Sequence, residues 1–324
     1  MGTSIVRYVC KEKGDSSWGV LHREAIFPLV KDFTCHQEVI RAYAEERSIF
    51  AAALRLEAVP SAALTFLSPI TPNIQLFCQG LNYADHRLEG GLDAGSEQGE
   101  NLIFTKAPSS ICGPNDDIVR PRGCVLLDYE IELGIVLKAD IPAPITLAEQ
   151  DLESVIGALV LANDVSARDF MFGAPAMQWF RGKSQRTFCP LGPVLYLLDT
   201  GDLHSLYELE LILKLNGKVK QQATTDLLIH KPARTLSELS TFTDLHAGDC
   251  LLTGTPGGVL VGIDLRSGLS IMLNLKDDAK RRRKFIAAQL ARTPFLQPGD
   301  MLELSIRSRD GSIDLGCQRN TIVG

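Results

Sequence analysis

Three acidic residues, Asp128, Glu130 and Glu132, alternate with other residues in the segment DYEIELGIVL. In a β-strand this spacing places all three carboxylates on one face, whereas in a helix residues two apart would diverge. Alternating acids commonly form the solvent face of a half-exposed strand. Here the continuation, LGIVL, is apolar on both faces, which indicates a strand that enters a core. Because carboxylates that converge near a core repel one another unless a cation compensates them, the pattern favours a metal site.

A fourth acidic residue, Asp164, directly follows the apolar run VIGALVLAN. We expect it at the end of a buried strand, although an Asn-Asp pair also commonly just terminates a strand. A carboxylate set without His or Cys suits a hard cation and disfavours zinc or copper. The sequence therefore predicts Mg²⁺ or Mn²⁺, with Ca²⁺ also compatible.

Three further segments contain residues that could take part in chemistry. His86 and Glu89 are three apart, a spacing that stacks them on one helical face, where Glu would orient a His general base. A surface pair at a helix end fits the same spacing. Lys183 lies in a Gly-Lys-Ser sequence, but Met177 replaces the first glycine of a phosphate-binding loop, which excludes that motif. The loop TGTPGGV at 253–259 forms either a tight turn or a close approach to a ligand.

Composition restricts the class of protein. The chain has 324 residues, 45% of them hydrophobic and 22% charged, as in globular domains. The net charge is −6, and the basic run 280–284 follows two aspartates in a helix-like segment, so a solvated helix face is favoured over nucleic-acid binding. No apolar run has membrane-spanning length and no secretory signal is present, which predicts a cytoplasmic protein. The eight cysteines contain no CxxC pair and are expected to be free thiols.

The chain divides into two predicted parts. Residues 1–72 form a small N-terminal domain, with two strand-like runs followed by a helical stretch from His36 to Leu54. Residues 73–324 form the larger part, whose many short strands predict a large mixed sheet, with a loop at 89–100 and an insertion at 262–296 that contains an amphipathic helix. Two hairpin turns are indicated, at Asn216-Gly217 and Asp310-Gly311.

Nine segments, taken in order, resemble the fumarylacetoacetate hydrolase family from about residue 74 to the C-terminus. They are GLNYADHRLE, FTKAPSSICGP, DYEIELGIVL, NDVSARD, QWFRGKS with CPLGP, NGKVKQ with TTDLLI, and HAGDCLLTGTPGGV. The resemblance implies an α+β fold built round a large mixed β-roll, with a small N-terminal domain, in a homodimer. It also implies that Glu130, Glu132 and Asp164 hold the metal, with Asp128 behind them.

The resemblance implies an enzyme as well, a hydrolase that cleaves a carbon–carbon bond in a small β-diketo acid of the acylpyruvate type through a metal-stabilised enolate. Lys183 and Thr255 would hold the substrate's carboxylate or developing negative charge. His86, paired with Glu89 on a lid, would activate water, and Gly90-Gly91 would act as the hinge of that lid.

Two departures from the family pattern concern the substrate. Many members have a substrate-orienting Gln where this chain has Met171, which suggests substrate binding through a less polar tail. Related members often carry an acidic residue where this chain has Arg186. An oxaloacetate decarboxylase and a dienoate isomerase use similar ligands and stay open as alternatives, as does a catalytically silent binding protein. The presence of both His86 and Glu89 favours hydrolysis.

Overall fold

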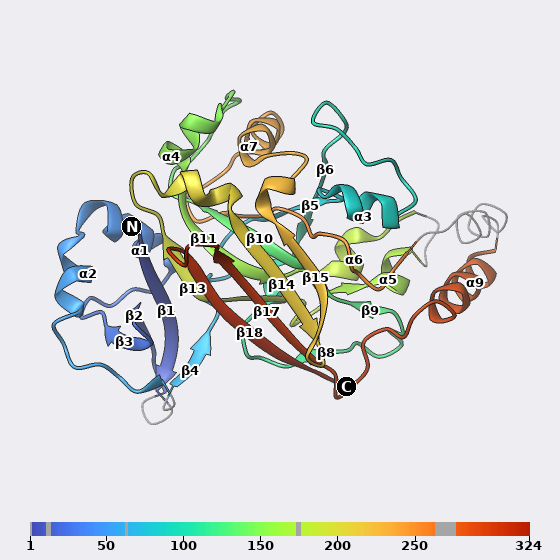
Figure 1. Ribbon diagram of the computed structural model, residues 1–324, viewed down its shortest axis with the longest axis horizontal. Helices are drawn as coiled ribbons and strands as arrows, with labels where there is room; N and C mark the ends of the chain where they lie inside the picture. The colour runs from blue at the N-terminus through green and yellow to red at the C-terminus, as the bar shows by residue number, and fades with distance from the viewer. Residues whose placement is uncertain (1, 11–13, 62–63, 173–175, 263–276) are drawn as a thin grey trace.

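The computed structural model describes residues 2–10, 14–61, 64–172, 176–262 and 277–324. Within them, eleven strands form one large mixed sheet with the order β3-β2-β1-β13-β11-β10-β16-β5-β6, to which β4 and β7 add at β1 and β13 (Figure 1). Its strands are β1 (Thr3–Cys10), β2 (Ser16–His22), β3 (Ala25–Pro28), β4 (Leu64–Leu67), β5 (Leu76–Gly80), β6 (Leu102–Lys106), β7 (Ile111–Cys112), β10 (Ile131–Leu137), β11 (Ile156–Asn163), β13 (Cys189–Leu197) and β16 (Cys250–Leu252).

A second sheet packs against the large one and has the order β15-β14-β17-β18-β8. Its strands are β8 (Ile118–Val119), β14 (Leu209–Leu215), β15 (Lys218–Thr224), β17 (Met301–Ser308) and β18 (Asp314–Val323). A short pair, β9 (Leu127–Asp128) and β12 (Ser166–Ala167), lies beside the two sheets. Gln318 of β18 donates through Nε2 to the carbonyls of Leu161 and Pro190, which ties the two layers together.

The helices lie around the two sheets. The described α-helices are α1 (His36–Glu45), α2 (Ser48–Ala53), α3 (Ala84–Glu89), α4 (Leu152–Val155), α5 (Arg168–Phe172), α6 (Trp179–Lys183), α7 (Pro232–Ser240) and α9 (Asp278–Leu290). Single 3₁₀ turns occur at Pro108–Ser110, Glu149–Asp151, Asp202–Tyr207 and Thr225–Leu227. In Figure 1, α1 and α2 accompany the N-terminal strands, whereas α3 lies near β5 and β6 on the opposite side of the molecule. None of the helices in the described ranges is both long and apolar enough to cross a membrane.

The central strands β10 and β11 are buried on both faces, as their continuous apolar runs predict. One face belongs to a core shared with the second sheet, in which Leu133 and Leu161 cluster with Leu304. The other face belongs to a core shared with α1, in which Val136 clusters with Val39. Alternate residues of the same strand therefore face different cores, which fixes the direction of the acidic side chains at the strand end.

Most of the expected local elements are confirmed. The second strand-like run forms the hairpin β2–β3, with Arg23 and Glu24 at positive φ in its turn, and the helical stretch is divided into α1 and α2. The turn at Asn216-Gly217 joins β14 and β15. Residues 263–276 of the expected insertion lie outside the described residues, but its helix is present as α9, and Phe285 packs into the core.

The α+β fold with a large mixed sheet is confirmed. The strands of the N-terminal segment are not isolated, because β1 pairs antiparallel with β13 from Thr3↔Leu197 to Val6↔Val194. The large sheet therefore runs continuously from the N-terminal segment to β6. The domain boundary at residue 72 stays a prediction.

Candidate active site

Three predicted metal ligands come together at the ends of two neighbouring strands. In the β10–β11 pairing Ile131 lies opposite Asn163 and Glu132 opposite Ala162, so the residues next beyond, Glu130 and Asp164, also meet. Glu130, Glu132 and Asp164 each place a carboxylate oxygen within 4.8 Å of the others'. All three are at least 96% buried, with exposed fractions of 4%, 0% and 0%. Strand register therefore brings together the three carboxylates that the family resemblance implied as metal ligands.

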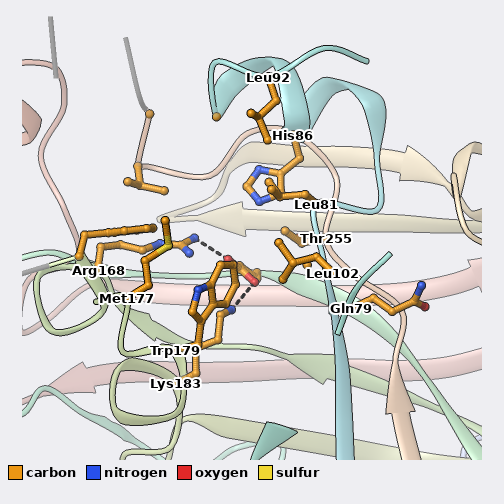
Figure 2. Close-up of a pocket in the computed structure, with 16 residues that line it drawn as sticks. Gln79, Leu81, His86, Leu92, Leu102, Arg168, Met177, Trp179, Lys183 and Thr255 are labelled. Carbon is orange, nitrogen blue, oxygen red and sulfur yellow. Dashed lines mark hydrogen bonds and ion pairs between the residues drawn. The ribbon is translucent and has the colours of Figure 1, made fainter. Parts of the chain in front are cut away.

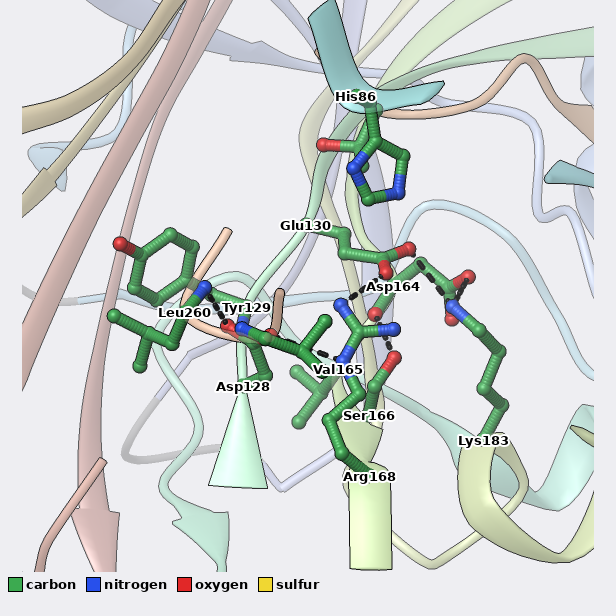
Figure 3. Close-up of polar contacts among 12 residues, drawn as sticks. His86, Asp128, Tyr129, Glu130, Asp164, Val165, Ser166, Arg168, Lys183 and Leu260 are labelled. Atoms are coloured by element: carbon green, nitrogen blue, oxygen red, sulfur yellow. Dashed lines mark hydrogen bonds and ion pairs between the residues drawn. The ribbon is translucent and has the colours of Figure 1, made fainter. Parts of the chain in front are cut away.

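Asp128 does not join this cluster, because the strand is interrupted between β9 and β10. Its carboxylate accepts hydrogen bonds from the backbone N–H groups of Leu260 and Val261 at 3.0 and 3.1 Å. It also pairs with Nε of Arg168 at 2.9 Å, and the same guanidinium contacts Glu130 (Figure 3). Asp128 thus orients Arg168 against a candidate ligand, which agrees with its expected place behind the ligands.

Two buried lysines complete the charge pattern. Nζ of Lys183, in α6, lies 2.8 Å from Glu130 Oε2 and 2.5 Å from Asp164 Oδ2. Nζ of Lys106, at the end of β6, lies 2.5 Å from Asp164 Oδ1. Lys106 was not among the predicted site residues, although it belongs to the segment FTKAP. Its sequence signal is a lone cation at the end of an otherwise uncharged strand.

The electrostatics distinguish the two glutamates. Burial opposes ionisation of Glu130, but the Lys183 and Arg168 cations outweigh it and hold its pKa below the usual value. Burial raises the pKa of Glu132 well above the usual value, and the neighbouring charges of Asp164 and Glu130 raise it further. In the absence of a further cation Glu132 is therefore the carboxyl that keeps its proton.

The donor set fits a hard divalent cation. Oε2 of Glu132 accepts a hydrogen bond from the Gly254 N–H at 2.8 Å, but its buried Oε1 has no hydrogen-bond partner. A buried polar atom without a partner is costly, and a cation among three carboxylates would satisfy it and relieve their repulsion. Glu130, Glu132 and Asp164 are the residues that would hold such an ion.

His86 and Glu89 lie on one face of α3, as expected from their spacing, with His86 Nδ1 3.5 Å from Glu89 Oε2. Figure 3 shows the imidazole above the Glu130 carboxylate. Oε1 of Glu89 accepts from the Gly258 N–H at 2.8 Å, and the Tyr129 hydroxyl donates to the Gly258 carbonyl at 3.0 Å. The pair His86 and Glu89 is therefore anchored to Gly258, in the loop that contains Thr255. Tyr129, which lies between Asp128 and Glu130, binds the same glycine.

Gly258 can hold this position only because it has no side chain. Its φ is +104°, and a Cβ there would lie 2.0 Å from the carbonyl oxygen of Lys220. Thr255, three residues before Gly258, is 2% exposed and accepts a hydrogen bond from Gln221 Nε2 at 2.8 Å. Oε1 of Gln221 also accepts from the Ile131 N–H, so Gln221 links the loop to β10. Gln221 is the last residue of the segment NGKVKQ, but it was not among the predicted site residues.

A cavity of about 290 Å³ lies beside the carboxylate cluster and His86 (Figure 2). Its polar side presents His86, Glu130, Arg168, Lys183 and Thr255, so three of the predicted catalytic and substrate-binding residues and one ligand face the same space. The remaining lining side chains are mostly apolar: Leu81, Leu92, Leu102, Phe172, Met177, Trp179 and Val261.

Met171 is not among the residues that line the cavity. Its side chain is fully buried beneath α6, where a Cβ on Gly182 would lie 2.1 Å from its Cγ. In this structure Met171 thus packs against the helix that carries Lys183, and its role in substrate binding stays a prediction. Arg186 is exposed and does not line the cavity. Apolar surface inside the cavity comes instead from side chains such as Phe172, which follows Met171 directly.

The fold and site define a carboxylate-rich centre at the end of a mixed β-roll. Comparison with known proteins shows which family has this architecture. The family model described as "Fumarylacetoacetate (FAA) hydrolase C-terminal" matches residues 75–323. The chain belongs to the fumarylacetoacetate hydrolase family.

Two curated relatives illustrate the range of the family. The chain is 36% identical over 210 residues to the mitochondrial oxaloacetate tautomerase FAHD2A of Bos taurus, a match that covers 64% of each chain. It is 37% identical over 180 residues to a 2,4-didehydro-3-deoxy-L-rhamnonate hydrolase of Sphingomonas sp., which covers 56% of this chain and 60% of that protein. The matches thus span less than two thirds of these relatives' lengths.

Solved structures show the same fold over the whole chain. A probable 2-hydroxyhepta-2,4-diene-1,7-dioate isomerase from Mycobacterium abscessus has a TM-score of 0.71 at 25% identity and covers 100% of this chain and 98% of its own. The maleylpyruvate hydrolase of Sphingobium sp. SYK-6, in complex with manganese(II) and pyruvate, has a TM-score of 0.70 at 20% identity, with 99% and 98% covered. The second likeness concerns the fold alone.

Proposed function

We propose that this protein is a divalent-metal-dependent hydrolase of a small acylpyruvate-like β-diketo acid. It cleaves the bond between the distal carbonyl carbon and the methylene carbon that joins the two carbonyl groups. The observation that carries the proposal is the position of His86, oriented by Glu89, above a buried cluster of three carboxylates, of which Glu130 lines the same cavity as His86. A centre for decarboxylation or isomerisation alone has no need of a base that activates water.

The metal proposal rests on the fit of the ligand set. Glu130, Glu132 and Asp164 would hold Mg²⁺ or Mn²⁺, and Ca²⁺ is compatible with the same oxygens. When bound, such an ion supplies a Lewis acid for the oxygens of the substrate's α-keto acid end. The maleylpyruvate hydrolase that shares this fold was solved with manganese(II), and we propose the same kind of ion for this site.

The chain's own residues perform the remaining steps in this proposal. Lys183 and Thr255, which line the cavity, bind the substrate carboxylate and hold the diketo acid against the carboxylate cluster. His86 accepts a proton from water, whose oxygen forms a bond to the distal carbonyl carbon. The carbon–carbon bond then breaks, and its electron pair stays on the pyruvate fragment, which takes up a proton. The products are a carboxylic acid and pyruvate.

The test is a substrate panel with purified protein, containing acetylpyruvate, longer acylpyruvates and oxaloacetate, each with Mg²⁺ or Mn²⁺ and with excess chelator. We expect acylpyruvates to yield pyruvate and a carboxylic acid in equal amounts, and activity to vanish with chelator and return with metal. Pyruvate and CO₂ from oxaloacetate alone would instead indicate a decarboxylase, and loss of the enol signal without pyruvate a tautomerase.

Two further proposals concern the protein as a whole. The family resemblance supports a homodimer, which light scattering coupled to size-exclusion chromatography would detect as a doubled mass. The sequence supports a cytoplasmic location, which imaging of the tagged full-length protein would test. The oxaloacetate tautomerase of Bos taurus is named as mitochondrial, so an organellar signal would contradict the second proposal.

A further inference from the structure

The walls of the cavity differ from its polar side in a way that bears on the substrate. Three apolar side chains line the cavity: Leu81, directly after β5, Leu102, at the start of β6, and Trp179, in α6. Figure 2 shows Leu81 and Leu102 on one side and Trp179 near Lys183 on the other. These segments are distant in sequence and converge only in the fold, so the apolar wall is a feature of the site and not of one apolar run.

Two contacts hold this wall in place. The ring of Trp179 packs against Phe104 with centroids 5.0 Å apart and planes inclined at 44°. Gly80 provides the space beside both walls, because a Cβ there would lie 2.9 Å from Leu102 Cδ2 and 3.4 Å from the Trp179 ring. The Trp179 ring and Leu102, with Gly80 between them, therefore suit an apolar part of a ligand whose polar end lies at the polar side of the cavity.

The charges in the cavity argue against a second carboxylate on the substrate. Arg168 is paired with Asp128 and Glu130, and Lys183 with Glu130 and Asp164. Lys183 is the cation proposed for the substrate carboxylate, which adjoins the α-keto group. Among the described lining residues no other lysine or arginine remains for a carboxylate at the distal end, and an unpaired charge against this wall would be strongly disfavoured.

We propose that the cavity selects 2,4-dioxo acids with a single carboxylate and an extended apolar acyl tail, which lies against Leu81, Leu102 and Trp179. The inference rests on the proposed function for the identity of the reacting group. It goes beyond that function by specifying the tail, and it excludes dicarboxylic substrates such as oxaloacetate as preferred ligands. The volume of about 290 Å³, close to the lower end for small-molecule sites, limits the length of the tail.

The experiment measures binding without turnover. N-alkyl oxamates keep the adjacent carbonyl and carboxylate but have no carbon–carbon bond between two ketones to cleave. With saturating Mn²⁺, a series from N-methyl to N-hexyl oxamate is titrated by calorimetry. Tryptophan fluorescence serves as a second readout, since Trp179 lines the cavity, and Trp179→Phe identifies its signal against buried Trp18.

We expect affinity to rise about fourfold for each added methylene until the cavity is filled, the gain for moving a CH₂ group from water into an apolar site. Oxamates of equal length that end in a carboxylate should bind more than about tenfold more weakly. Equal affinity across the alkyl series, or tighter binding of the carboxylate-ended series, would overturn the inference. A chain-length dependence without acylpyruvate cleavage would leave the tail site standing and refute the proposed hydrolase.

Two variants locate the tail. Leu102→Asn keeps the approximate size but should reduce the gain per methylene, whereas the matched control Leu227→Asn, at a 53% exposed position outside the cavity, should not. Gly80→Ala should push Leu102 into the cavity and shift the best ligand to a shorter tail. If both cavity variants keep the parent's chain-length profile, the tail does not lie between these residues and the assignment is wrong.

Discussion

Binding of a divalent cation should release a proton from Glu132. In the metal-free protein burial raises the pKa of this carboxyl well above its usual value, and the charges of Asp164 and Glu130 add to the effect. A metal ligand must be ionised, so the cation and the proton compete for the same group. Glu130 contributes no proton, because Lys183 and Arg168 outweigh the effect of burial and keep its pKa low.

The magnitude follows from this single competing proton. At a pH below the pKa of Glu132, each metal ion bound displaces about one proton, so the affinity should rise about tenfold per pH unit. That change corresponds to about 1.4 kcal/mol of binding free energy per unit. Above the pKa the carboxylate is already ionised, and the dependence should level off.

The assay is calorimetric titration of Mg²⁺ or Mn²⁺ into chelator-treated protein in buffers of different ionisation enthalpy. The slope of the observed enthalpy against the buffer enthalpy gives the number of protons released. Glu132→Gln is the matched variant, because it keeps the size of the side chain but cannot ionise, and it should bind metal more weakly with no proton release. Absence of proton release from the parent protein in the pH range above the usual titration of a glutamate carboxyl, or an equal release from the variant, would refute the reasoning.

Three other predictions concern separate parts of the molecule. His86→Ala should lower the rate of hydrolysis by about 10²–10⁴-fold without changing metal affinity. The control His22→Ala, at an exposed position, should change neither quantity. A parallel loss of metal binding in His86→Ala would contradict its role as a general base. Tyr129→Phe removes the hydrogen bond to Gly258 and should lower kcat more than KM at a stability cost of about 0.5–1.5 kcal/mol, and an unchanged kcat would show that this contact does not position the pair His86 and Glu89. Burial lowers the pKa of His36 from 6.5 to about 4, so between these pH values the unfolded chain binds more protons than the folded protein. The free energy of unfolding should therefore fall by about 3 kcal/mol as the pH falls through that window. Urea unfolding would measure this change, with His36→Gln as the pH-insensitive control.

Local elements were predictable because they depend on residues close together in sequence. The apolar runs of β10 and β11, the turn at Asn216-Gly217 and the shared helical face of His86 and Glu89 each follow from spacing within one segment. The ordered motifs also sufficed to recognise the family, since a family is a pattern of such segments.

The arrangement of the site was predictable only in part. The sequence indicated which acids belong together, but strand register decided that Glu130 and Asp164 meet while Asp128 turns away to Arg168. Lys106 contacts Asp164 across a separation of 58 residues, and no local pattern predicts such a contact.

The case of Met171 shows the physical reason most directly. Sequence alignment with a motif places a residue along the chain, but the direction of its side chain depends on what packs against it, and here Gly182 lets Met171 fill the space beneath α6. The apolar wall of the cavity is instead assembled from β5, β6 and α6. The sequence by itself determined the types of the chemical groups and the local elements that carry them, whereas tertiary packing decided which of them share one cavity, because distances between segments far apart in the chain are set by strand pairing and core packing.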